Sequence, residues 1–267
     1  MNMNIERIVK GWGMAAVLML PGAASATLID RGGGLIYDDV LDITWLRDAN
    51  YAFTSGFAAA NLESDGGTDD ISADGRMGWD AAVAWADDLV FGGYDDWRLP
   101  TLGPIDGSAF DAFLSNNATT DWGWAKTTTD GTDGGWRDGS GNPVSEMGHM
   151  YYVNLGNLGF CTPNDGDPTS CVEQPGFGLD NTGLFDNLQS DGYWSGLESG
   201  TSNAWNFRFN QGAQVRNSRH VGFFAWAVHP DDIAAQSVPE PGTLVLLGAG
   251  LGLLGLGRRA RRHSALR

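Results

Sequence analysis

The chain has 267 residues, of which 16 are Lys or Arg and 33 are Asp or Glu, so its formal net charge is −17. A chain this acidic is repelled by phosphate backbones, which excludes nucleic-acid binding as its main function. Hydrophobic residues make up 42% of the sequence, which excludes wholesale disorder, and two cysteines are too few for a four-cysteine zinc site.

The first 26 residues have the pattern of a secretory signal peptide. Arg7 and Lys10 precede an apolar run at 14–20, and residues 24–26 (Ala-Ser-Ala) are the small residues that a signal peptidase accepts. The apolar run is too short to span a bilayer. We therefore expect export and cleavage after residue 26, with an uncleaved membrane anchor as the alternative.

Residues 27–237 are predicted to form one domain, because no linker, repeat or low-complexity tract divides them. The first predicted elements are two short strands, 35–37 and 42–46, that form a hairpin. In 78–90 the apolar residues recur at helical spacing along one continuous face, which predicts an amphipathic helix.

The next segments alternate between extended chain and loops. Residues 96–101 are expected to be extended, because the residue before Pro100 avoids the helical conformation. A shorter helix is predicted at 108–114. The Gly-, Asp- and Thr-rich segment 116–142 is predicted to form long surface loops.

The second half of the domain is predicted to be rich in strands, at 149–155, 192–196, 203–210, 213–216 and 223–228. In 203–210 the aromatic residues alternate with polar ones, which is typical of a half-buried strand. Residues 210–212 (Asn-Gln-Gly) can turn that strand into the next. Helices early and strands late predict a single compact α+β domain with an antiparallel sheet and one or two helices.

Three stretches in this order resemble a bacterial family named for the C-terminal domain of a collagen-like adhesin, the Lcl C-terminal domain: 42–48 (DITWLRD), 79–86 (WDAAVAWA) and 92–101 (GGYDDWRLPT). Residues 193–195 and 204–210 fit the same family. The resemblance covers about 35–229. It implies a compact fold like that of C-type lectins and a surface or adhesive role, and it implies no catalytic residues.

Asp65, Asp69, Asp70 and Asp74 alternate with glycine in 64–75, and such a loop can bring several oxygen ligands toward one calcium ion. The closing Glu of an EF-hand is missing. Calcium is therefore predicted as the one possible cofactor, with a solvated acidic loop as the alternative.

Aromatic residues in polar segments are candidates for stacking on sugar rings. The candidates are Trp122, Trp124, Trp136, Tyr193 and Trp194. Filling of the core is the alternative, since the chain has 11 tryptophans. Residues 174–176 (Gln-Pro-Gly) lack the last ligand of the triplet through which C-type lectins bind sugar with calcium.

Two further features are predicted to hold loops in place. Cys161 and Cys171 are expected to form a disulfide, because the chain is exported. Arg98 is expected to pair with a carboxylate, Asp95 or Asp96, and to lock a turn, with ligand binding as the alternative.

Residues 238–267 combine three features in a fixed order. Pro239, Glu240 and Pro241 come first, the apolar run 243–257 follows, and a basic cluster closes the order: Arg258, Arg259, Arg261 and Arg262. The apolar run covers about 22 Å as a helix, short of the roughly 30 Å hydrocarbon core, and the basic cluster would stay on the cytoplasmic side. The order resembles the PEP-CTERM sorting signal of Gram-negative bacteria, which implies cutting by the membrane enzyme exosortase; a plain tail anchor is the alternative.

Between residues 27 and 238 there remain nine basic and 31 acidic residues, a net charge of −22. The sequence predicts a protein that meets signal peptidase and exosortase, passes through an inner-membrane intermediate, and reaches the cell surface or extracellular matrix. We predict a non-catalytic binding or matrix component, and the PEP-CTERM resemblance implies the link to extracellular polysaccharide and biofilm. Two alternatives stay open: an acidic structural protein bridged by calcium, and an enzyme acting on matrix polysaccharide.

Overall fold

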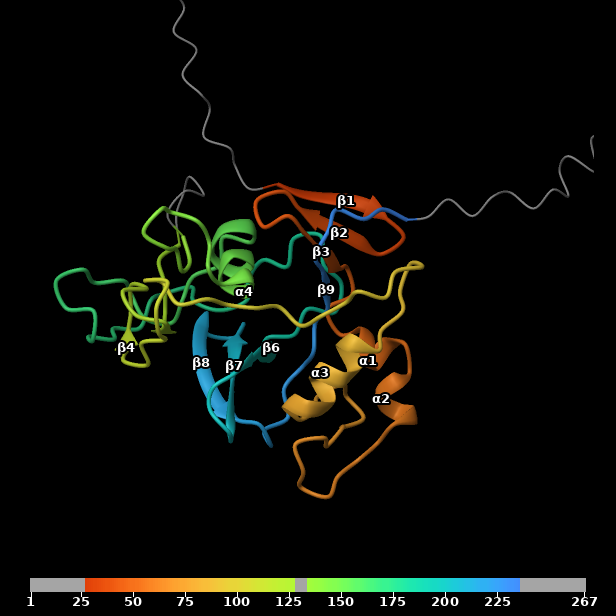
Figure 1. The fold of residues 1–267 in the computed structure, drawn as a ribbon. Helices are drawn as coiled ribbons and strands as arrows, with labels where there is room; N and C mark the ends of the chain where they lie inside the picture. The colour runs from red at the N-terminus through yellow and green to blue at the C-terminus, as the bar shows by residue number, and fades with distance from the viewer. Residues whose placement is uncertain (1–26, 128–133, 236–267) are drawn as a thin grey trace, which may run out of the picture.

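The computed structural model describes residues 27–127 and 134–235, which contain two small sheets and few helices (Figure 1). The first sheet has the strand order β1 (Leu28–Gly32), β2 (Leu35–Asp38), β3 (Ile43–Leu46) and β9 (Val228–His229), all antiparallel. The second has the order β4 (Leu114–Ser115), β5 (Trp122–Gly123), β8 (Ala213–Ser218), β7 (Asn203–Arg208) and β6 (Gly192–Glu198). Only the pair of β4 and β5 is parallel in it.

The predicted hairpin is confirmed as β2 and β3, and its turn is organised by a buried carboxylate. Asp38 is fully buried, and its Oδ1 accepts hydrogen bonds from the backbone amides of Val40 and Leu41. Asn154 donates a third hydrogen bond, at 2.6 Å, to Oδ2. Burial raises the pKa of the Asp38 carboxyl, and the three hydrogen bonds lower it in part.

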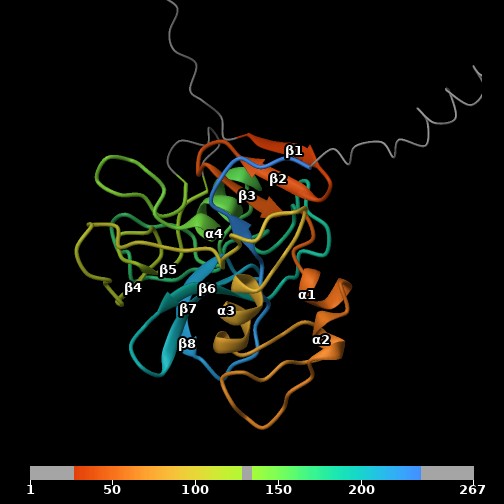
Figure 2. The ribbon, with the colours of Figure 1, turned by 45° about the vertical axis from the view of Figure 1, so that its right-hand side comes forward.

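The predicted long helix is confirmed as α3 (Trp79–Asp87), whose apolar face contributes Trp79, Ala82, Trp85 and Ala86 to the core. Two single-turn helices precede it, α1 (Tyr51–Thr54) and α2 (Phe57–Ala60). In both ribbon views the three helices lie together at one end of the molecule, away from β1 and β2 (Figures 1 and 2).

The prediction of a helix at 108–114 is wrong, because a side chain replaces the helical hydrogen bonds. Both oxygens of Asp121 accept backbone hydrogen bonds, one from Ile105 at 2.9 Å and one from Asp111 at 2.7 Å. The chain at 105–111 therefore wraps around the Asp121 carboxylate instead of forming a helix. The next regular element is the short strand β4.

The prediction of a strand at 149–155 is also wrong. This segment continues α4 (Glu146–His149) as the π-helical turn η1 (Met150–Asn154). Ser145 caps α4 by accepting a hydrogen bond from the backbone amide of Gly148. The consecutive tyrosines of η1 are both fully buried, which the alternation of a half-buried strand does not allow.

The strands predicted at 192–196, 203–210 and 213–216 are confirmed as β6, β7 and β8. The predicted half-burial of β7 is wrong, because Asn206 on its polar face is also buried. The Asn206 amide donates to the backbone oxygen of Val215 and to Oδ1 of Asn217. From 223–228, only Val228 belongs to a strand.

The predicted turn after β7 needs a glycine at one position. Gly212 donates a 2.7 Å hydrogen bond to the backbone oxygen of Arg208 and has a φ of 68°. A Cβ atom at Gly212 would lie 2.6 Å from the Tyr151 ring. The chain reverses there with no room for a side chain.

One core joins the two sheets, α3 and the α4–η1 segment, and aromatic rings fill much of it. The ring centroids of Trp45 and Trp226 are 4.4 Å apart, and the ring of Phe185 lies 4.7 Å from that of Trp226. The α+β class is therefore confirmed, while the likeness to C-type lectins and the boundaries of the domain stay predictions. No helix in 27–127 or 134–235 is long and apolar enough to cross a membrane.

Both described ends of the chain lie beside β1 (Figure 1). Arg31 in β1 donates through Nε to Asp232 at 2.7 Å, and the backbone amide of Ala235 reaches the Arg31 carbonyl at 3.5 Å. Both ends of the described chain therefore lie at the first sheet.

Candidate functional site

The acidic loop 64–75 does not gather its four predicted calcium ligands at one point. Asp65 and Asp70 accept hydrogen bonds from glycine amides of the loop itself, whereas Asp74 pairs with Arg76 at 3.3 Å. Within the described residues no group of three or more His, Cys, Asp or Glu side chains is placed to hold a metal ion. Calcium binding by this loop stays a prediction.

Burial corrects the prediction of sugar stacking for three residues. Trp136 is 1% exposed, and Tyr193 and Trp194 are fully buried, so no sugar ring can reach their faces. Their polar atoms are also bonded inside the domain. Trp194 Nε1 donates to the Met77 carbonyl, and the Tyr193 hydroxyl accepts from the Gln189 amide.

The other two predicted stacking residues, Trp122 and Trp124, are half-buried. The guanidinium of Arg216 lies 5.1 Å from the centre of the Trp122 ring and 5.9 Å from that of Trp205. Trp124 contacts the Phe160 ring, with 6.2 Å between centroids. Contact of Trp122 and Trp124 with a sugar stays a prediction.

Arg98 makes the predicted ion pair, but its partner is neither Asp95 nor Asp96, which remain exposed. Its guanidinium donates two hydrogen bonds to Glu146, at 2.7 and 2.8 Å. The same carboxylate accepts the backbone amide of Thr101 at 2.7 Å. The pair fastens the extended chain after Arg98 to the first turn of α4, so its role is structural.

The predicted disulfide between Cys161 and Cys171 is confirmed. The loop that it closes is also tied to Asn116, whose side chain donates to the Ser170 carbonyl and accepts from the Asn164 amide. Covalent closure and these hydrogen bonds hold a loop that has little apolar surface of its own.

Replacing both cysteines by serine is expected to lower the free energy of unfolding by about 3 kcal/mol, because the unfolded chain regains the entropy of an open loop. For a domain of this size the melting temperature should fall by about 6–12 °C. Calorimetry of the double variant measures it, with reduced wild-type protein as the matched control. An unchanged melting temperature would contradict the stabilising role of the disulfide.

A polar cavity of about 270 Å³ opens beside α1. Four separate segments line it: the start of α1, the loop before α3, the loop before β6 and the chain after β8. The lining residues are Asn50, Phe53, Asp74, Arg76, Asn187, Gln189 and Phe224. We call this the α1 cavity.

Arg76, one of the two charged residues that line the α1 cavity, is held from three sides. Arg76 donates a 2.7 Å hydrogen bond to Asp191 and pairs with Asp74, and its guanidinium lies 5.2 Å from the centre of the Phe224 ring. Two carboxylates therefore surround one guanidinium. Together with Asp191, which is bonded to Arg76 but does not line the cavity, this group has a net negative charge.

The amide side chains that line the α1 cavity make only some of the hydrogen bonds that they could make. Asn50 is 5% exposed and donates to the Asp74 carbonyl, while its Oδ1 accepts no hydrogen bond from the described residues. Gln189 donates through Nε2 to the Asn187 carbonyl at 2.6 Å. The buried Nε of Arg76 likewise has no partner in the described part of the chain.

The sequence pointed to only one residue of the α1 cavity, Asp74, and assigned it to a metal. No spacing pattern links four segments that the fold alone brings together. The best available signal was Arg76, a single cation inside an acidic loop. The exposure of Phe53, at 52%, could be seen only in the structure.

A second cavity, of about 230 Å³, is lined by Thr68, Asp80, Thr201, Ser202, Arg219 and His220. Its charged groups are already bonded to one another. Asp80 accepts hydrogen bonds from Thr68 and Arg219, which hold the pKa of its carboxyl below the ordinary value although burial raises it. The α1 cavity differs from it in having apolar aromatic side chains, Phe53 and Phe224, in its lining.

Comparison with known proteins identifies one segment of the chain. Residues 237–262 match the model of the PEP-CTERM protein-sorting motif. No curated protein and no solved structure matches the chain. The matched segment and the signal peptide predicted at 1–26 both lie outside the described residues.

The match confirms the sorting signal predicted at this end of the sequence. The motif implies that the protein is exported, processed by exosortase and sorted to the cell surface of a Gram-negative bacterium. The signal peptide and the resemblance of the central region to the Lcl C-terminal domain stay predictions.

Proposed function

We propose that the central domain is a non-catalytic binding component of the extracellular matrix, which associates with polysaccharide at the cell surface. The observation that carries the proposal is the sorting motif at 237–262, because it directs the protein to the place where such polysaccharide accumulates. The resemblance of this signal to PEP-CTERM systems, which often accompany polysaccharide synthesis, supports the choice of ligand.

The carboxyl groups of the domain support a binding role over catalysis. A glycoside hydrolase needs a carboxylic acid of raised pKa that faces an open site. Among the described residues, burial raises the pKa of Asp38 and Asp121, but both are at most 1% exposed and bonded to backbone amides. Asp74, which lines the α1 cavity, is paired with Arg76, and so is the neighbouring Asp191.

Affinity electrophoresis tests the proposal. Mature protein recovered from the cell surface is run through native gels with and without the extracellular polysaccharide of the same cells. We expect polysaccharide to retard the protein, also in the presence of a chelator, and no reducing ends to be released. An acidic protein of similar net charge is the control and should migrate equally in both gels.

Three results would contradict the proposal. Equal mobility in both gels would mean that the domain does not bind the polysaccharide. Release of sugar by the purified protein, abolished by one carboxylate substitution, would make it an enzyme. Retardation that disappears in chelator would favour the acidic structural protein bridged by calcium.

A further inference from the structure

We infer that the α1 cavity binds one uncharged sugar unit of a polysaccharide chain. The inference rests on the proposed function and goes beyond it, because it assigns a site and a chemical class of ligand. The cavity volume of about 270 Å³ lies just below the usual range of small-molecule sites, which suits one sugar unit rather than a long stretch of chain.

The amide side chain of Gln189 is suited to hydrogen bonding with sugar hydroxyl groups. A carboxamide offers donors and an acceptor side by side, which matches neighbouring hydroxyl groups that each donate and accept. Nε2 of Gln189 donates to the Asn187 carbonyl, while its Oε1 makes no hydrogen bond in the described part of the chain. Its Oε1 is therefore free to accept a hydrogen bond from a sugar hydroxyl.

Two buried polar atoms of the lining residues lack a hydrogen-bond partner among the described residues. They are Oδ1 of Asn50 and Nε of Arg76. A buried polar group without a partner costs free energy, and native structures seldom leave one unexplained. Both atoms have almost no accessible surface, so a hydroxylated ligand would pair with them only after the side chains of Asn50 and Arg76 turn toward the cavity.

An exposed aromatic ring lies at the rim of the cavity. Phe53 projects from α1 with 52% of its surface exposed, although its ring is entirely apolar. A sugar ring has faces of C–H groups that remove such apolar surface from water. The same unit can therefore cover Phe53 and direct its hydroxyls toward the amides.

Charge selects the class of sugar. Asp74 and Arg76 in the lining balance in charge, the neighbouring Asp191 adds a carboxylate, and the domain between residues 27 and 238 carries a net charge of −22. A uronate, sulfate or phosphate group would meet this negative field at short range. An uncharged sugar avoids that repulsion and keeps its hydrogen bonds.

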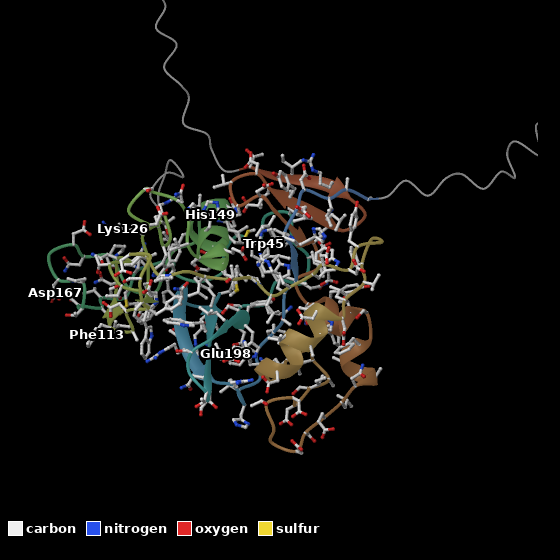
Figure 3. The ribbon with its side chains drawn as sticks, in the orientation of Figure 1. Trp45, Phe113, Lys126, His149, Asp167 and Glu198 are labelled. Atoms are coloured by element: carbon white, nitrogen blue, oxygen red, sulfur yellow. A yellow bond between two sulfur atoms is a disulfide. The ribbon has the colours of Figure 1, made fainter. Side chains whose placement is uncertain are left out.

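The test uses the native extracellular polysaccharide, separated on an anion exchanger into a neutral and an acidic fraction. Mature wild-type protein and two cavity variants, Phe53→Ala and Gln189→Ala, are run in gels that contain each fraction and a chelator. The matched control is Phe113→Ala, because Phe113 is 80% exposed and lies at the edge of the molecule far from α1 (Figure 3).

We expect the neutral fraction to retard the wild-type protein, with an affinity that does not change between low and high salt. Each cavity variant should bind about tenfold more weakly, while Phe113→Ala should stay within about twofold of the wild type. Both substituted side chains of the cavity are partly exposed, and circular dichroism of the variants confirms that they fold.

Retardation of the cavity variants equal to that of the wild type would overturn the α1 cavity as the site while leaving the proposed function in place. Retardation by the acidic fraction alone would overturn the uncharged class of ligand. If neither fraction retards the wild-type protein, the proposed function itself fails, and the inference fails with it.

Discussion

Stability against urea is expected to fall as the pH is lowered from 6.5 toward 3, and His149 is expected to cause much of the fall. His149 ends α4, is 1% exposed, and has no hydrogen bond to either ring nitrogen among the described residues (Figure 3). Burial, with a smaller effect of the nearby charge of Arg137, lowers its pKa from 6.5 to about 3.

The sign follows from which state binds the proton. Above pH 6.5 His149 is neutral in both states and adds no pH dependence. Below it the unfolded chain takes up the proton and the folded domain does not, so folding loses roughly 1.4 kcal/mol per pH unit. By pH 3 the loss reaches roughly 4 kcal/mol, a large part of the stability of an ordinary domain.

Carboxyl groups titrate in the lower part of the same range and act in both directions. Asp38 and Asp121, whose pKa is raised by burial, regain stability as the pH falls, whereas Asp80, whose pKa is lowered by its hydrogen bonds despite burial, loses it. All three remain in a variant of His149. The difference between variant and wild type therefore isolates the histidine.

Urea unfolding at a series of pH values measures the effect. His149→Leu and His149→Gln should both have a flatter dependence on pH below 6.5, because neither side chain titrates there. Met147→Leu, in the same helix, leaves His149 in place and should keep the wild-type slope. A wild-type slope in both histidine variants would contradict the assignment.

The second large effect is expected when the ion pair of Arg98 is broken from one side. In Glu146→Ala the Arg98 guanidinium and the Thr101 amide lose their shared acceptor. The Glu146 side chain is 12% exposed and that of Arg98 33%, so water replaces these bonds only in part. The free energy of unfolding should fall by about 2–3 kcal/mol.

A pair substitution separates the cost of an unpaired charge from the value of the pair itself. Glu146→Leu combined with Arg98→Met should recover part of the loss, because no charge is left without a partner. Asp186→Ala, which breaks the exposed pair with Arg47, is the control and should cost less than about 1 kcal/mol. An equal cost for Glu146→Ala and Asp186→Ala in urea unfolding would show that the Arg98 pair is an ordinary surface contact.

The sequence predicted elements well where local pattern and tertiary packing agree. The helical face of 78–90 and the strands at 203–210 and 213–216 have periodicities that the core then uses. The failures occur where a distant residue decides. Asp121 binds the backbone that precedes it in place of a helix, and the buried tyrosines after residue 149 demand a helical turn.

The candidate site was less accessible to sequence reasoning for the same reason. Aromatic residues in polar segments suggested surface contacts, but Trp136 and Trp194 complete a core that joins two sheets. The α1 cavity needs Phe53 of α1 together with Arg76 and Gln189 of two loops, and the fold sets their proximity. Sequence order contains no trace of that proximity, whereas the sorting motif is contiguous and was recognised.

The central claim is that the sorted protein reaches the matrix and is held there by polysaccharide. It is tested most directly by digesting the polysaccharide with glycosidases and measuring how much mature protein passes from the cell-associated matrix into solution. We predict that most of the wild-type protein is released together with the sugar, and that Phe53→Ala is already largely soluble before digestion. A mature protein that stays with the cells after complete digestion would contradict the claim.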